Sequence, residues 1–172
     1  MRIRTAVAAG AVPAAVAALL LSAPQSQAAG ARVAPCAEQA LTVRAKADAV
    51  APSIVRIDVT NRGGRACVVD RIPTVTFGDL DGAALPVPEG ESGPYRIGAG
   101  ASAYAAVRTI ADPADPEARR VDTITVAADP SHFGRTFTAA RLGAGDAVLV
   151  WEPVTTWWQP SRAAADRALG LS

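Results

Sequence analysis

The stretch that decides the fold is SIVRIDVT, residues 53–60, in which apolar and polar residues alternate. Val55, Ile57 and Val59 fall on one side of an extended chain, and the polar residues between them fall on the other. Successive side chains of a strand point to opposite faces of a sheet. This period of two therefore predicts a strand that buries one face and leaves the other polar.

The chain that follows this strand carries a turn signal and then a second apolar run. Residues 61–65 read NRGGR, a cluster of residue types that favour turns, and residues 66–69 read ACVV. Two β-type runs separated by a short glycine-containing turn are typical of an antiparallel hairpin. We therefore predict that residues 53–60 pair directly with residues 66–69.

Further short alternating runs occupy most of the remaining chain up to Trp151, and we find no amphipathic helix between Cys36 and Trp151. About seven to nine short strands separated by turn signals favour an all-β, antiparallel β-sandwich or barrel, which we place at residues 36–152. Besides the two runs above, the predicted strands are residues 40–44, 74–77, 95–97, 102–110, 121–127, 135–139 and 147–151.

The last twenty residues, 153–172, are predicted to form a C-terminal tail with one short helix. Ser161 is a suitable N-cap for a helix over residues 162–169, and Gly170 is a suitable stop. The tail would follow the sandwich as a separate terminal segment.

The first residues have the three parts of a secretory signal peptide. Arg2 and Arg4 form a positive start, residues 7–21 carry no charge, and Ser26-Gln27-Ala28 places small residues where signal peptidase requires them. The apolar run is shorter than the ~20 residues that span a bilayer. We therefore predict cleavage after about Ala28, a short segment over residues 29–35, and a secreted protein without stable membrane insertion; an uncleaved anchor is the alternative.

The charge balance argues against a nucleic-acid partner. The chain has 172 residues, with 17 Lys+Arg, 16 Asp+Glu and a formal net charge of +1. Removal of residues 1–28 takes away two arginines and no acid, which leaves 15 bases against 16 acids and a net charge of −1. Nucleic acids bind clustered cations that replace their counterions, and no such run is present. The composition leaves the oligomeric state open.

The mature chain contains two cysteines, Cys36 and Cys67, and one histidine, His132. An even cysteine count in an exported protein predicts a disulfide, and two cysteines allow one pairing; two free thiols are the alternative. Zinc, copper and haem sites need more imidazole or sulfur ligands than this chain offers. We therefore expect no metal and no cofactor.

Only one histidine is available for catalysis. A serine hydrolase would need His132 as its general base, and the neighbouring Ser131 is a poor nucleophile for it because adjacent residues rarely form that pair. A surface histidine in the 129–134 turn is the simpler interpretation. No pair of carboxylates stands out for glycoside hydrolysis, so we predict no catalytic residues.

All three tryptophans, Trp151, Trp157 and Trp158, lie within eight residues of one another. Aromatic faces bind sugars, peptides and cations, so Trp157 and Trp158 form a candidate ligand-binding surface. The alternative is that both side chains pack the terminal segment onto the sandwich.

Four segments in a fixed order resemble one known family. They are VTNRGGRAC at 59–67, RIPTV at 71–75, DLDG at 79–82 and IGAGASA at 97–103. This order resembles the exported actinobacterial family of domain of unknown function 4232, over about residues 36–139. Ile72 and Ala99 depart from the family pattern, which has an aromatic and a proline there. The resemblance implies an exported, immunoglobulin-like sandwich with a Cys–Cys bridge, and no assigned activity.

We therefore expect an exported, non-catalytic β-sandwich module that binds a protein or glycan of the cell envelope. The alternatives are a purely structural or accessory domain and a hydrolase that uses His132.

Overall fold

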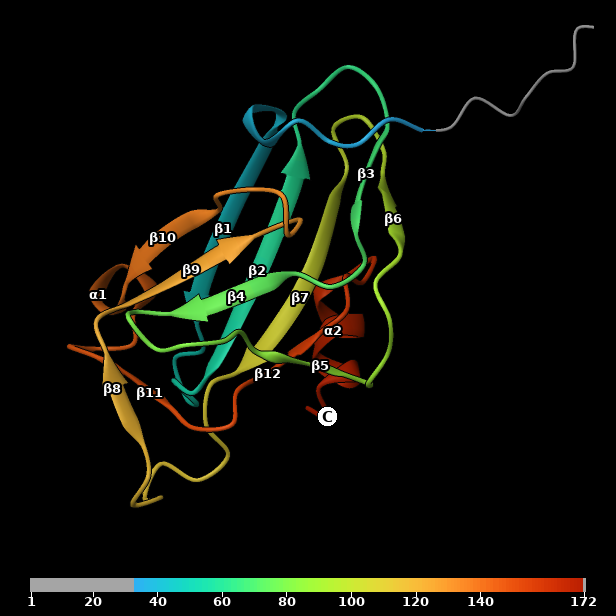
Figure 1. Ribbon diagram of the computed structural model, residues 1–172. Coiled ribbons are helices and arrows are strands. Elements are labelled where there is room, and N and C mark those ends of the chain that lie inside the picture. Colours follow the sequence, from blue (N-terminus) through green and yellow to red (C-terminus); the bar gives the residue numbers. More distant parts are fainter. Residues whose placement is uncertain (1–32, 172) are drawn as a thin grey trace, which may run out of the picture. The chain divides into compact units, whose positions relative to one another are not determined.

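The computed structural model describes residues 33–171 (Figure 1). The predicted signal peptide at residues 1–28 lies outside the described residues, as does most of the short segment that follows it. Within 33–171 the chain is built from β-strands with short helices, which confirms the all-β class and the C-terminal helix. None of the described helices has the length and apolar character that a membrane span requires.

The larger sheet has five strands in the order β1-β2-β7-β12-β5. All its pairings are antiparallel except the one between β12 and β5, which is parallel. The strands are β1 (Leu41–Ala47), which follows a short 3-10 helix η1 (Glu38–Ala40), β2 (Ile54–Asn61), β7 (Ser102–Arg108), β12 (Val154–Thr156) and β5 (Leu85–Val87).

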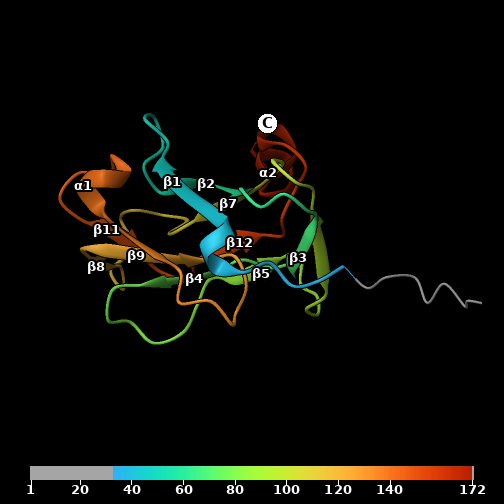
Figure 2. The same ribbon diagram turned by 90° about the horizontal axis from the view of Figure 1, so that it is seen from above.

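The smaller sheet forms a second layer, seen edge-on in Figure 2. It has the order β10-β9-β4, and a two-stranded ladder of β11 and β8 adjoins it. Its strands are β4 (Thr74–Phe77), β9 (Thr123–Ala127) and β10 (Arg135–Thr138), and the ladder consists of β8 (Arg119–Val121) and β11 (Val148–Val150). Helix α1 (Ala139–Leu142) directly follows β10.

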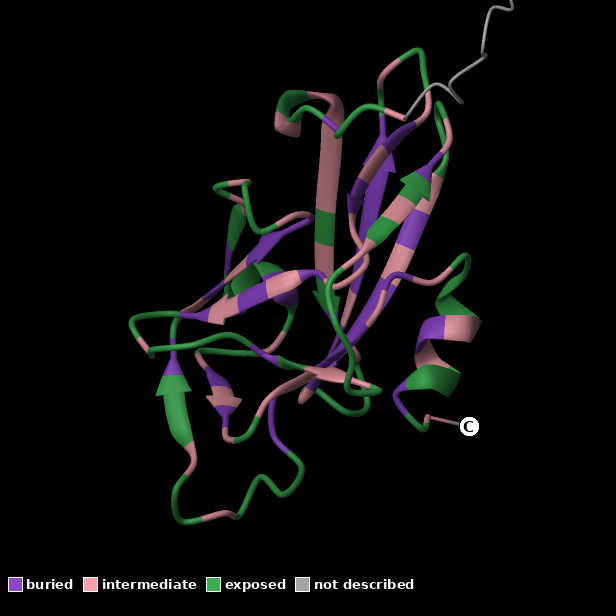
Figure 3. Cartoon of the chain, turned by 45° about the vertical axis from the view of Figure 1, so that its right-hand side comes forward, coloured by how far each residue is buried: buried purple, intermediate pink, exposed green. Residues whose placement is uncertain are grey.

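The core lies between these two layers and confirms the predicted face of the 53–60 strand. Val55, Ile57 and Val59 are each at most 1% exposed, and they share one apolar cluster with Ile124 and Val126 of β9. The burial colouring of Figure 3 shows the same purple segments along the middle of the larger sheet. Burial of this alternating face is the main favourable contribution to folding.

The predicted hairpin between residues 53–60 and 66–69 is wrong. Strand β3 (Cys67–Asp70) pairs with β6 (Pro94–Ile97), whereas β2 pairs with β1 and β7. Both edges of β2 are therefore occupied, so the chain leaves the sheet after Asn61. The Asn61 amide stabilises this departure, because its Nδ2 donates to the carbonyls of Arg65, Ile97 and Gly98 at 2.8–3.2 Å.

Residues 33–171 contain twelve strands rather than the predicted seven to nine, because several are too short to show a period of two. The predicted strand at 121–127 is divided between β8 and β9, and β5 contains Pro86. The predicted boundary at 152 also needs correction: residues 154–156 form β12 inside the larger sheet, so the tail begins after that strand.

Helix α2 (Arg162–Ala168) confirms the predicted C-terminal helix and its caps. The Ser161 Oγ accepts a hydrogen bond from the Ala164 N–H at 3.2 Å, and Gly170 has a φ of 82°. Ala165 packs with Ile54 and Ala106 in a second apolar cluster. Because Ile54 and Ala106 point away from the main core, α2 covers the outer face of the larger sheet (Figure 1).

The disulfide between Cys36 and Cys67 is confirmed, with a Cα–Cα distance of 4.8 Å. It joins the N-terminal end of the described chain to β3, where the Cys36 N–H also donates to the Val68 carbonyl at 2.8 Å. The cross-link closes a loop over a sequence separation of 31 residues. It restricts the unfolded chain, which raises the free energy of unfolding.

We predict that Cys36→Ser/Cys67→Ser lowers the free energy of unfolding by about 3–4 kcal/mol, because the unfolded loop regains its entropy. Urea unfolding followed by circular dichroism measures the change. A thiol reductant should lower the urea concentration at the unfolding midpoint of the wild type and should not change that of the double variant. Equal midpoints for the two oxidised proteins would contradict this role.

Candidate functional site

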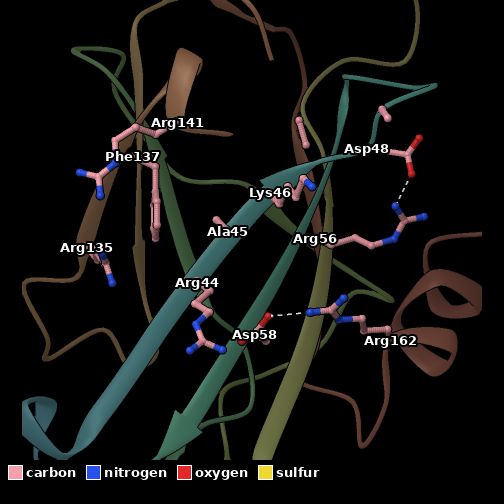
Figure 4. A pocket seen from close by; sticks show the side chains of 12 residues that line it. Arg44, Ala45, Lys46, Asp48, Arg56, Asp58, Arg135, Phe137, Arg141 and Arg162 are labelled. Carbon is pink, nitrogen blue, oxygen red and sulfur yellow. Dashed lines mark hydrogen bonds and ion pairs between the residues drawn. The ribbon is translucent and has the colours of Figure 1, made fainter. Parts of the chain in front are cut away.

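A cavity of about 550 Å³ runs across strand β1 at the edge of the larger sheet (Figure 4). We call it the arginine groove, because six of its twelve lining residues are basic and two are acidic. On one side of β1 lie residues of β2 and α2, and on the other lie residues of β10 and α1. The basic residues are Arg44, Lys46, Arg56, Arg135, Arg141 and Arg162.

The alternation along β1 places two of these bases. Val43 and Ala45 pack against the main core, so Arg44 and Lys46 project from the opposite face and are exposed. In the antiparallel register, Arg44 is opposite Asp58 of β2 and Lys46 is opposite Arg56. The polar side of the strand pair therefore forms the floor of the groove.

Lys46 and Arg56 are like charges placed directly opposite each other, an arrangement that destabilises a sheet. Arg56 is compensated by two carboxylates. Its Nε donates to Asp166 of α2 at 2.9 Å, and its Nη1 forms an ion pair with Asp48 in the turn after β1. Lys46 has no ion pair among the described residues.

The ion pair with Arg56 lowers the pKa of Asp48 from 3.8 to about 2, and the backbone N–H groups of Ala51 and Val50 contribute to the same shift. The two carboxylates raise the pKa of Arg56 in turn. Both groups therefore stay charged over the pH range in which proteins operate, and the turn after β1 is tied to β2 and α2.

A second ion pair joins α2 to the groove. The Arg162 Nη2 lies 3.1 Å from the Asp58 Oδ1, with the Asp58 side chain 12% exposed and the Arg162 side chain 65% exposed. A carboxylate on a covered sheet face needs a counterion, so Arg162 neutralises Asp58 rather than offering a free charge.

The opposite wall presents Arg135 and Arg141 around Phe137. The Arg135 guanidinium lies 5.3 Å from the centre of the Phe137 ring and donates to the Val43 carbonyl at 3.2 Å. Arg141 lies in α1, whose N-cap Thr138 accepts from the Arg141 N–H at 3.2 Å. Phe137 is itself only 6% exposed, so the wall presents cations rather than an aromatic face.

Four of the six bases, Arg44, Lys46, Arg135 and Arg141, have no carboxylate partner among the described residues. They gather in one concavity of a chain that carries a net charge of −1 beyond residue 28. Guanidinium groups bind carboxylates and phosphates through paired N–H donors. The arrangement can therefore hold a ligand with several negative charges.

The predicted surface of Trp157 and Trp158 does not form, because Trp158 belongs to the core. Its side chain is 2% exposed, and its Nε1 donates to the Ala128 carbonyl at 3.4 Å. Its backbone N–H donates to the Arg71 carbonyl at 2.8 Å. A ring buried in this way fills the sandwich and cannot stack on a ligand.

Trp157 is half-buried, and its ring is covered by other parts of the chain. The Arg71 guanidinium lies 5.0 Å from the ring centre. A Cβ atom placed on Gly90 would come within 2.4 Å of the Trp157 Cζ2, so the loop at Gly90 packs tightly against the indole. The two tryptophans attach the segment after β12 to the sandwich, which is the alternative considered from the sequence.

His132 makes a structural contact. Its Nε2 lies 3.1 Å from the Cys36 carbonyl, which connects the 129–134 turn to the disulfide segment. The Ser131 Oγ donates to Asp129 at 2.7 Å rather than to the imidazole. Hydrogen bonds to Asp129 from Ser131 and the Asp70 N–H outweigh its partial burial and lower its pKa.

Sequence reasoning missed the arginine groove because its bases come from β1, β2, β10, α1 and α2. No run of basic residues marks it. The available signal was the outward position of Arg44 and Lys46 beside the apolar Val43 and Ala45. That pattern identifies the exposed face of β1 but cannot show which distant elements meet there.

The fold and the groove define a disulfide-bridged, all-β domain with a cationic concavity at one sheet edge. The chain belongs to the family described as domain of unknown function (DUF4232), whose model matches residues 36–158. The match includes β12 and Trp158, so it extends beyond the span that the motifs indicated. Comparisons with curated proteins and with solved structures found no match.

We predict that Asp48→Asn lowers the free energy of unfolding at neutral pH and has a much smaller effect near pH 2. The pKa of Asp48 is lower in the folded protein than its ordinary value of 3.8, so its stabilisation is complete above pH 3.8 and is lost as the pH falls through about 2. Urea unfolding at pH 6, 4 and 2 measures the difference.

The same ion pair gives an independent check. Arg56→Gln should raise the pKa of Asp48 towards 3.8, because the largest cause of its depression is removed. Nuclear magnetic resonance of the Asp48 side-chain carboxyl carbon follows this titration. A stability difference between wild type and Asp48→Asn that stays constant across the pH range would contradict the assignment.

Proposed function

We propose that the protein is an exported, non-catalytic module that binds an anionic glycan polymer of the cell envelope in the arginine groove. The observation that carries this proposal is the gathering of four bases without carboxylate partners in one cavity. Such a cavity concentrates positive potential on a chain that is otherwise close to neutral, and it attracts polyanions.

The lining of the groove favours a glycan over a protein partner. Protein interfaces rely on apolar and aromatic anchors at their centre. The apolar residues of the groove are three alanines and Phe137, which is 6% exposed. A polymer of hydroxyl and anionic groups needs charge and hydrogen bonds rather than an apolar pocket, and the guanidinium groups offer both.

Export is supported by the disulfide and by the N-terminal sequence. Disulfides persist in oxidising compartments outside the cytoplasm. The three-part pattern at residues 1–28 is typical of a secretory signal peptide. A module delivered to the envelope meets polymers rich in carboxylates and phosphodiesters, which are the groups that arginine recognises.

The non-catalytic part of the proposal is supported by the position of His132. Its Nε2 is engaged with the Cys36 carbonyl, and the hydroxyl of the adjacent Ser131 donates to Asp129. A general base needs its nucleophile within hydrogen-bond reach. The arrangement of this turn therefore favours binding over hydrolysis.

The test uses polygalacturonate as the anionic glycan, dextran as a neutral glycan and polyglutamate as an acidic peptide. We expect the full chain to bind polygalacturonate and not dextran. Its affinity for polygalacturonate should fall as the salt concentration rises. Arg44→Glu/Arg141→Glu should weaken binding at least about tenfold, because it reverses two of the four unpaired charges. Isothermal titration calorimetry measures the affinities.

The matched control is Arg65→Glu/Arg96→Glu, which changes the net charge equally at exposed positions outside the groove. It should bind polygalacturonate within about threefold of the wild type. Equal losses in both double variants would show that net charge alone decides binding and would refute the groove. Tighter binding of polyglutamate than of polygalacturonate would assign an acidic protein segment as the ligand instead.

A further inference from the structure

A second cavity, of about 290 Å³, lies where the turn after β4 meets the ends of β8 and β11. It shares no lining residue with the arginine groove. Phe77 and Val150 line it as buried apolar side chains, 2% and 3% exposed. Around them stand Trp151 and three charged side chains, Asp81, Arg119 and Glu152.

Trp151 is the tryptophan that remains partly open to solvent beside a cavity. It is half-buried, and its backbone N–H donates to the Thr109 carbonyl at 2.9 Å, which holds its position after β11. The indole is a large apolar surface with one polar edge. Because Trp151 lines the cavity, its indole supplies apolar surface for a ligand that is apolar on one side and hydroxylated at its rim.

The three charged side chains come from three separate elements. Asp81 lies in the turn after β4, Arg119 begins β8 opposite Val150, and Glu152 follows Trp151. All three residues are exposed, and none makes a side-chain hydrogen bond or ion pair within residues 33–171. The two carboxylates can accept hydrogen bonds from hydroxyl groups, and the Arg119 guanidinium can donate several to them.

Glu152 is held in an unfavourable backbone conformation. Its φ is 45°, and within residues 33–171 every other residue with a positive φ is a glycine. A side chain with a Cβ is strained in the left-handed region, and glycine would be more stable there. Strain of this kind persists where the side chain serves a purpose, and here it keeps a carboxylate at the cavity beside Trp151.

We propose that this cavity binds one ring of a neutral saccharide. The ring stacks on Trp151, and its hydroxyl groups hydrogen-bond to Asp81, Glu152 and Arg119. A volume of about 290 Å³ is at the lower end of ligand pockets, which suits a single ring rather than a chain. Two acids and one base give this cavity no excess of positive charge, so its ligand differs in class from that of the arginine groove. The proposal for this cavity does not rest on the function proposed for the groove.

The test measures binding of chitotetraose, cellotetraose and mannotetraose to the full chain by saturation-transfer magnetic resonance and calorimetry. We expect at least one of the three to bind. Trp151→Ala should weaken that binding at least about tenfold, as loss of an aromatic anchor does, and Trp151→Phe should retain most of it. The conservative variant keeps the experiment decisive if the alanine variant fails to fold.

Two further variants separate recognition from folding. Arg119→Ala should weaken saccharide binding, whereas Arg120→Ala, its neighbour on β8 that lies outside this cavity, should leave it unchanged. Glu152→Gly should raise the melting temperature because it relieves the left-handed strain, and at the same time weaken saccharide binding because a carboxylate is lost. Substitution of a residue with only a structural role would not raise the melting temperature and weaken saccharide binding at the same time.

Several results would overturn the proposal. Absence of saturation transfer from the wild-type protein to all three saccharides would do so, as would equal affinities of wild type and Trp151→Ala. Binding of choline in preference to every saccharide would assign the cavity to a cationic ligand. These outcomes are distinct from a failure of polygalacturonate to bind, which would concern the arginine groove alone.

Discussion

Strand β2 is covered on both faces, and the packing of the elements around it depends on this constraint. Its inner face, with Val55, Ile57 and Val59, is at most 1% exposed between the two layers. Its outer face carries Arg56 and Asp58, and Asp58 is 9% exposed. Charged groups on a covered face destabilise the fold unless each has a partner. The partners come from the turn after β1 and from α2, so the charges on β2 decide where α2 can dock.

This arrangement explains which parts of the fold could be predicted from the sequence. The alternation in residues 53–60 identifies β2 and its buried face, and the cap at Ser161 identifies α2, because both signals are local. The pairing of β3 with β6 was not predictable, since it depends on both edges of β2 being occupied by β1 and β7. Three-residue strands such as β5 and β12 carry no readable period.

The candidate sites were harder to predict than the fold. Trp157 and Trp158 stand out in the sequence, yet a large side chain is also what a core poor in aromatic residues needs, and Trp158 serves that purpose. The bases of the arginine groove are unremarkable in the sequence because tertiary pairing brings them together from five elements. Trp151 was recognisable as a tryptophan, but its cavity depends on the turn after β4, which lies about seventy residues earlier in the chain.

Two local arrangements in this domain oppose its stability. One is the pair of like charges, Lys46 opposite Arg56, and the other is the left-handed backbone of Glu152. Natural sequences agree with local preferences at most positions and depart from them mainly where a function requires it. Each departure here lines a different cavity, the first the arginine groove and the second the Trp151 cavity. Loss of the Lys46 charge or of the Glu152 side chain would relieve these arrangements without breaking an ion pair among the described residues, which supports the proposal of ligand binding at two separate places.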